Sequence, residues 1–273
     1  MPVPAWPSAP GLSGAVPGMA WFSLHGLPEP PLAYLPRLRP AGFLVLETAE
    51  FTNPDHVVAV RDAGLRLGAA VTGIADPAVI LPTAQAAASA GADYIRMKVL
   101  SAWSSESTVA IALDAVERAI AATGIPIHVE THRSTASQDL FRWSSHLRQR
   151  PSLRLTLDVS HYRITGDWPM PASEPDHAAA QRLVLERTSG LHLRISDGER
   201  IQVPMRQAGG LIPAHRALWQ DAFARWREQA PGNAYFPMIT ELLRPPFAPV
   251  DDAGAEIGDR WAESLALRDA VLA

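Results

Sequence analysis

The chain lacks cysteine altogether and contains a single lysine, Lys98. The absence of cysteine excludes disulfide bonds, thiolate catalysis and cysteine-ligated zinc. The 24 basic and 28 acidic residues give a net charge of −4. A nucleic-acid partner is therefore not expected, because binding to a phosphate backbone depends on dense Lys and Arg. No apolar run approaches the roughly 20 residues that a membrane-spanning helix needs. Polar chemistry must come from carboxylates, histidines and arginines.

The chain has 273 residues, of which 47% are hydrophobic and 19% charged, a balance typical of a globular protein. Residues 1–19 contain five prolines and no basic residue. They therefore lack the charged and apolar regions of a secretion signal. We expect a flexible leader over residues 1–19, a single catalytic domain over residues 20–273, and a cytoplasmic location.

Short β-like runs alternate with longer helical stretches from residue 21 onward. Each run is mostly apolar and bounded by Gly, Pro or polar residues, as buried parallel strands are. The eight runs are Trp21–His25, Phe43–Glu47, Leu65–Thr72, Asp93–Val99, Ile125–Thr131, Leu153–Asp158, Gly190–Ser196 and Tyr235–Glu241. Apolar residues at helical spacing occur between them in Pro77–Ala90, Glu106–Thr123 and Pro213–Gln229. Eight βα units in about 250 residues predict an α/β fold of the (β/α)8 TIM barrel type. An open doubly wound sheet is the alternative, but no glycine-rich phosphate turn follows the first run.

In a TIM barrel, catalytic groups lie at the C-terminal ends of the strands. Several runs end on a charged residue, namely Glu47, Lys98, Glu130, Asp158 and Glu241. Carboxylates that converge in a low-dielectric interior repel one another strongly. One divalent ion (Mn²⁺, Mg²⁺, Co²⁺ or Zn²⁺) would balance the acids of the last strands, with His192 as a further ligand. Arg194 is the alternative compensating cation, in which case no metal is needed.

Three segments resemble the xylose-isomerase-like TIM barrel superfamily, namely HVETHRST at 128–135, LRLTLDVSHY at 153–162 and MITELLRPPF at 238–247. That superfamily contains sugar-phosphate isomerases and epimerases, dehydratases and the endonuclease IV type of DNA-repair enzyme. The resemblance covers nearly the whole chain. It implies that the metal ligands are Glu130, Asp158, His192 and Glu241, and that His161 contacts the substrate. Strand seven allows two alignments. One makes His192 the ligand, and the other puts Arg194 at the ligand position with His192 one layer deeper.

These expectations predict an isomerase or epimerase acting on a sugar, a sugar phosphate or another α-hydroxy carbonyl compound. Binding of adjacent carbonyl and hydroxyl oxygens to a metal acidifies the neighbouring C–H, so that a carboxylate base can form the enediolate. We expect Glu130 and Glu241 to be the acid–base pair, acting from opposite faces of the substrate. The residues expected to hold substrate oxygens are His161, Arg194, His132, Lys98 and Gln202.

Three alternatives stay open on the sequence alone. A dehydratase would use the same metal and base and then expel a β-hydroxyl group. A DNA-repair nuclease needs a trinuclear zinc cluster and a basic groove, which nine histidines and a net charge of −4 disfavour. A non-catalytic sugar-binding barrel would result if Arg194 replaces the metal. The expected partner is a small sugar-like molecule, with neither nucleic acid nor membrane, and a homo-oligomer remains open.

Overall fold

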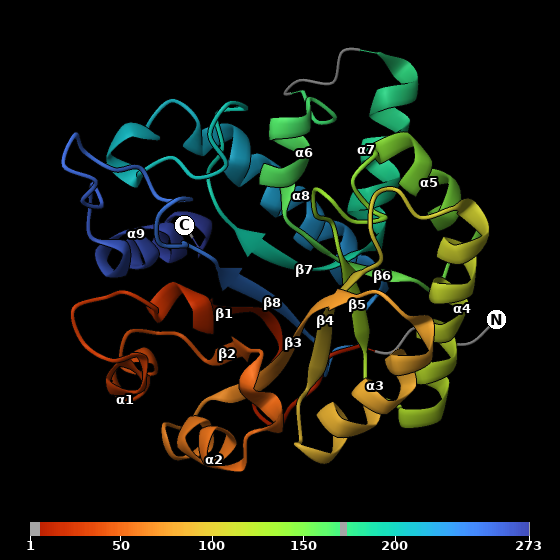
Figure 1. Ribbon diagram of the computed structural model, residues 1–273, viewed down its shortest axis with the longest axis horizontal. Helices are drawn as coiled ribbons and strands as arrows, with labels where there is room; N and C mark the ends of the chain where they lie inside the picture. The colour runs from red at the N-terminus through yellow and green to blue at the C-terminus, as the bar shows by residue number, and fades with distance from the viewer. Residues whose placement is uncertain (1–5, 170–173, 273) are drawn as a thin grey trace.

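A closed barrel of parallel strands forms the centre of the computed structural model, which describes residues 6–169 and 174–272. The strands follow one another around the barrel in chain order, and helices cover its outside (Figure 1). The strands are β1 Gly14–Ala20, β2 Val45–Thr48, β3 Arg66–Ile74, β4 Tyr94–Val99, β5 Ile127–Glu130, β6 Arg154–Leu157, β7 Thr188–Leu193 and β8 Tyr235–Thr240. The prediction of a (β/α)8 barrel is confirmed.

Helices follow the strands as the alternating pattern predicted. Their bounds are α1 Leu35–Leu38, α2 Pro54–Asp62, α3 Ile80–Ser89, α4 Glu106–Thr123, α5 Leu140–Gln149, α6 Val159–Thr165, α7 Pro175–Arg187, α8 Ile212–Gln229 and α9 Arg260–Leu272. Helix α4 has the predicted bounds because both of its ends are encoded locally. The Ser105 side chain accepts a hydrogen bond from the Thr108 backbone N–H, and Gly124 ends the helix in the left-handed conformation.

The first strand lies seven residues before the position that the sequence pattern predicted. Trp21–Leu24 forms a 3-10 turn, whereas Gly14–Ala20 is the strand that pairs with β2 and β8. The segment was missed because it contains Pro17 and two glycines, which normally indicate a turn. Gly18 is required here, since a Cβ atom would lie 2.9 Å from the Val45 backbone carbonyl oxygen of the neighbouring strand. Residues 14–19 of the expected leader therefore belong to the barrel, and residues 1–5 lie outside the described residues.

Near the C-terminal ends of the strands, the two-residue period separates apolar outward-facing residues from polar inward-facing ones. Leu155 and Leu157 of β6, and Leu191 and Leu193 of β7, are fully buried in the hydrophobic core that also contains residues of the surrounding helices. The alternate positions of the neighbouring strands carry charged side chains that point into the barrel. The fold therefore gathers polar groups inside the barrel. No helix in the described part of the chain is both long and apolar enough to cross a membrane.

Candidate active site

Eight charged or titratable side chains meet inside the barrel toward the C-terminal ends of its strands. This ion cluster consists of Glu47, Arg96, Lys98, Glu130, Asp158, His192, Arg194 and Glu241. All except Lys98, whose side chain is 18% exposed, are almost completely buried. Burial of so many charges is costly unless each is paired, so their pairing decides what the site can do.

The cluster has two layers, and the lower one, which lies deeper in the barrel, is centred on Glu47 of β2. Its carboxylate accepts hydrogen bonds from Arg96 Nε at 2.9 Å, His192 Nε2 at 2.9 Å and Tyr94 Oη at 3.1 Å. Burial by itself would raise the pKa of Glu47, but the charges of Arg96 and His192 lower it below the usual value. Arg96 also reaches Glu130, with 2.9 Å between Nη1 and Oε2.

The upper layer contains Arg194, which follows β7, and two acids that follow the adjacent strands. Arg194 Nη2 lies 2.5 Å from Asp158 Oδ2 and 2.5 Å from Glu241 Oε2. The other carboxylate oxygen of Asp158 accepts hydrogen bonds from the backbone N–H and the hydroxyl of Ser160. Of the two alignments considered for strand seven, this geometry matches the one that places Arg194 beside the acids and His192 a layer deeper.

His192 joins the two layers. Its Nδ1 lies 3.2 Å from Glu241 Oε2 and 3.5 Å from Glu130 Oε1, while its Nε2 donates to Glu47. Burial lowers the pKa of His192, but the surrounding carboxylates outweigh this effect and raise the pKa well above its usual value. The same interactions hold the pKa values of Glu130 and Glu241 well below the usual range, against the effect of burial. At neutral pH the cluster therefore contains ionised acids and a cationic imidazole.

The four residues expected to bind a metal do lie together. Glu130, Asp158, His192 and Glu241 each offer a ligand atom, and these four atoms are all within 4.8 Å of one another. The donor types and spacing form a buried group that could hold a divalent ion. With the side chains in these positions, Arg194 Nη2 contacts two of the four residues, so an ion bound there would have to displace it.

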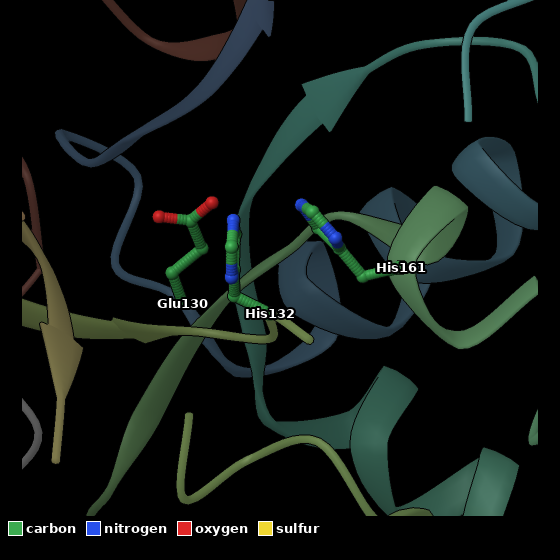
Figure 2. Close-up of side chains that lie close together, drawn as sticks. All are labelled: Glu130, His132 and His161. Carbon is green, nitrogen blue, oxygen red and sulfur yellow. The ribbon is translucent and has the colours of Figure 1, made fainter. Parts of the chain in front are cut away.

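A second group of potential ligands lies beside the first (Figure 2). It consists of Glu130, His132 and His161, whose side chains point toward the same region. The two imidazole rings are 3.7 Å apart between centroids, and His132 Nδ1 contacts the Arg133 carbonyl oxygen. Burial lowers the pKa of His161 to about 3 and also lowers that of His132, so both rings are neutral at pH 7.

Two of the residues expected to hold substrate make contacts within the protein. Gln202 donates to the Leu243 carbonyl and accepts from the Leu243 backbone N–H, at 3.1 and 2.8 Å. Its amide therefore links the loop after β7 to the segment after β8. Lys98 Nζ lies 3.7 Å from Glu130 Oε1 and belongs to the ion cluster.

A cavity of about 640 Å³ is formed by the loops that follow β5, β7 and β8. Arg133, Arg200 and Gln202 line it, together with the segment 246–249. It lies on the side of the C-terminal ends of the strands, where the sites of TIM barrels open.

Arg96 is the member of the ion cluster that the sequence reasoning missed. It contacts two carboxylates of the cluster, Glu47 and Glu130. The available signal was its position two residues before Lys98, since residues i and i+2 of a strand share a face. A charge in the middle of an apolar strand, on the same face as another charge, indicates a barrel-interior group.

Comparison with known proteins extends the description of the fold. No family model matches the chain, and no curated protein sequence matches it either. A sugar phosphate isomerase/epimerase from Parabacteroides distasonis has a similar structure, with a TM-score of 0.59 and 14% identity over 94% of this chain and 95% of that one.

Two other solved structures are similar in the same way. A xylose isomerase-like TIM barrel protein from Mycobacterium smegmatis, in complex with magnesium, gives a TM-score of 0.54 and 12% identity over 95% of this chain and 98% of that one. A probable 3-DHS dehydratase from Bacillus anthracis gives a TM-score of 0.55 and 12% identity over 85% of this chain and 94% of that one. Sequence identities this low establish architecture alone. The chain thus shares the TIM-barrel fold of these three structures.

Proposed function

We propose that this protein is an isomerase or epimerase of a small α-hydroxy carbonyl compound, such as a sugar or sugar phosphate. The observation that carries the proposal is a set of buried polar atoms beside two ionised carboxylates. Arg194 Nε and Nη1 and both ring nitrogens of His161 have no hydrogen-bond partner among the described residues. Buried polar groups nearly always have partners. A ligand with several oxygens would provide them.

Arg194 is suited to hold the oxygens of an enediolate. Its free N–H groups would donate to the negative charge that develops when the C–H proton leaves, in a site with few water molecules. His161, and His132 next to it, would bind neighbouring hydroxyl groups. Lys98 is the remaining contact that we propose for the substrate.

Glu130 and Glu241 are the proposed acid–base pair. The structure does not place them on opposite sides of an open space, because both contact His192 Nδ1, at 3.5 and 3.2 Å. The substrate would therefore lie above both carboxylates, toward the mouth of the barrel. His192 would pass a proton from one carboxylate to the other, so that one removes the substrate proton and the other returns it.

The enediolate needs a positive charge at its oxygens. One source is a divalent ion (Mn²⁺, Mg²⁺, Co²⁺ or Zn²⁺) held by the group of Glu130, Asp158, His192 and Glu241, which would polarise the carbonyl when bound. The other source is Arg194. Because Arg194 contacts Asp158 and Glu241 directly, the two sources exclude each other in this arrangement.

Exchange of the substrate C–H with deuterium from solvent tests the proposed function. Wild-type protein, with and without added Mn²⁺, should exchange at least one member of a panel of ketoses, aldoses and their phosphates. Glu130→Gln and Glu241→Gln should lower the exchange rate by roughly 10² to 10⁴, the usual contribution of an acid–base group. Glu29→Gln, an exposed carboxylate paired with Arg37, is the control and should leave the rate unchanged. Absence of exchange on the whole panel would contradict the proposal.

A dehydratase is the second candidate, and one contact favours it. His161 Nε2 lies 3.5 Å from Asp158 Oδ2, so a carboxylate and an imidazole lie together where a departing hydroxyl group could be bound. The panel experiment separates the two functions, because a dehydratase forms an unsaturated or deoxy product that has lost water. An isomerase or epimerase forms a product of unchanged mass.

A further inference from the structure

We propose that the guanidinium of Arg194 takes the place of a divalent metal ion, so that the site holds no metal when it is active. The inference concerns the site on which the proposed function rests, but it is a statement about cation binding and can be tested without substrate. Its basis is the position of Arg194, the charges around it and its unpartnered N–H groups.

Arg194 is fixed between two of the acids that a metal would need. The register of β7 and β8 pairs Leu193 with Thr240, so the next residues, Arg194 and Glu241, leave the barrel side by side. Arg194 is only 1% exposed, and Nη2 makes 2.5 Å contacts with both Asp158 and Glu241. A metal ion bound to these two carboxylates would have to displace this group.

The ion cluster holds three cationic side chains without a metal. The guanidinium groups of Arg96 and Arg194 and the Lys98 amine lie 2.5–3.7 Å from the carboxylates of the cluster, which belong to Glu47, Glu130, Asp158 and Glu241. Three cationic side chains thus face four carboxylates. A divalent ion added to this set would leave excess positive charge in a buried site, which is unfavourable.

Arg194 also has N–H donors left over that could bind substrate oxygens, a role that the open coordination positions of a metal ion would otherwise have. Nε and Nη1 are buried and have no partner among the described residues. These two groups lie on different edges of the guanidinium plane, so each can donate to a separate oxygen. Oxygens of an α-hydroxy carbonyl compound would supply these acceptors. Arg194 would therefore replace both roles of a metal, neutralising the acids and binding the substrate oxygens.

Metal binding by the wild-type protein is the first test. Protein treated with a chelator and then titrated with Mn²⁺ should show no stoichiometric binding by calorimetry or by the electron paramagnetic resonance signal of free Mn²⁺. Metal analysis of the untreated protein should give well below one equivalent of any divalent ion. One tightly bound equivalent that is lost in Glu241→Gln would overturn the inference, whatever the activity of the protein.

Arg194→Gln supplies the complementary test, because it removes the cation and leaves Glu130, Asp158, His192 and Glu241 free to bind. This variant should bind one Mn²⁺ at least 10-fold more tightly than the wild type, and Arg194→Lys, which keeps the charge, should not. If loss of the guanidinium destabilises the fold, Mn²⁺ should raise the melting temperature of Arg194→Gln but not that of the wild type. Equal responses of the two proteins to Mn²⁺ would contradict the proposal.

Discussion

At the scale of single residues, Glu47 organises the lower half of the site although it lies below the atoms that would touch a substrate. It is 1% exposed and accepts hydrogen bonds from Arg96, His192 and Tyr94. Its charge keeps His192 cationic and orients Arg96 toward Glu130. Removing one partner of a buried ion pair leaves the others uncompensated, which costs far more than the pair contributes as a whole.

Glu47→Gln should therefore lower the free energy of unfolding by about 3–5 kcal/mol, the range for breaking a buried ion pair. The glutamine keeps the size of the side chain but cannot balance the charges of Arg96 and His192. Urea denaturation followed by circular dichroism measures the change. Tyr94→Phe removes a single neutral donor to the same carboxylate and should cost only about 1 kcal/mol. Equal losses in the two variants would show that the charge of Glu47 is unimportant for stability.

The sequence indicated most of the residues of the cluster but not their pairing. Glu130, Asp158 and Glu241 were found because each follows an apolar run, a pattern that is local in the chain. Whether Arg194 lies beside those acids depends on the register between β7 and β8, and that register is set by strand pairing across the barrel. Spacing alone therefore left both alignments of strand seven open.

At the scale of elements, the loop after β7 is tied to helix α8 by a histidine. His215 Nε2 accepts a hydrogen bond from the Ser196 backbone N–H at 3.3 Å, and its Nδ1 lies 3.0 Å from the Leu211 carbonyl oxygen. Both contacts require the neutral ring with the proton on Nδ1. Burial lowers the pKa of His215 below 6.5, its usual value. Protonation of the ring would remove the hydrogen bond from Ser196, which lies two residues after Arg194.

This contact makes part of the stability depend on pH. The unfolded chain takes up a proton on His215 near pH 6.5, and the folded protein does so only at lower pH. Stability from this residue is therefore complete above pH 6.5 and is lost as the pH falls toward the lowered value, with a slope of up to about 1.4 kcal/mol per pH unit. His215→Gln, compared with the wild type from pH 8 to pH 4.5 by urea denaturation, should show a shallower decline.

The internal control is the difference in unfolding free energy between the wild type and His215→Gln at pH 8, where residue 215 is uncharged in both proteins. It measures the cost of the substitution itself. Identical slopes below pH 6.5 would mean that other groups account for the whole pH dependence.

Helix α4, whose ends have strong local signals, was predicted well, whereas strand β1, which depends on tertiary contacts, was not. Helix α4 carries its own cap and its own C-terminal glycine, so its bounds follow from the sequence. Strand β1 contains Pro17 and glycines that a strand normally avoids, and it is stable because β2 and β8 pair with it on both sides. The apolar segment Trp21–Leu24 was the stronger strand signal, but it forms a turn.

At the scale of the whole molecule, barrel closure depends on the segment that the sequence analysis assigned to a leader. The register of β1 with β8 extends from Gly14 paired with Tyr235 to Met19 paired with Thr240. Before the strand, the Tyr235 backbone N–H donates to the Pro7 carbonyl at 2.9 Å, and Arg154 lies 4.5 Å over the ring of Trp6. The N-terminal segment thus closes the sheet and covers the end of the barrel opposite the candidate active site.

Deletion of residues 1–19 should therefore abolish cooperative folding, because β2 and β8 would become unpaired edges and the ion cluster would be open to water. Deletion of residues 1–13 keeps all of β1 and removes only the contacts of residues such as Trp6 and Pro7. That shorter deletion should leave a cooperative urea transition at a lower midpoint, with a circular dichroism spectrum close to that of the full chain.

Size-exclusion chromatography completes the measurement, since the longer deletion should elute as an expanded or aggregated species. If the chain without residues 1–19 unfolded cooperatively at the midpoint of the full chain, β1 would not be needed for closure. The barrel would then have to close by another strand pairing.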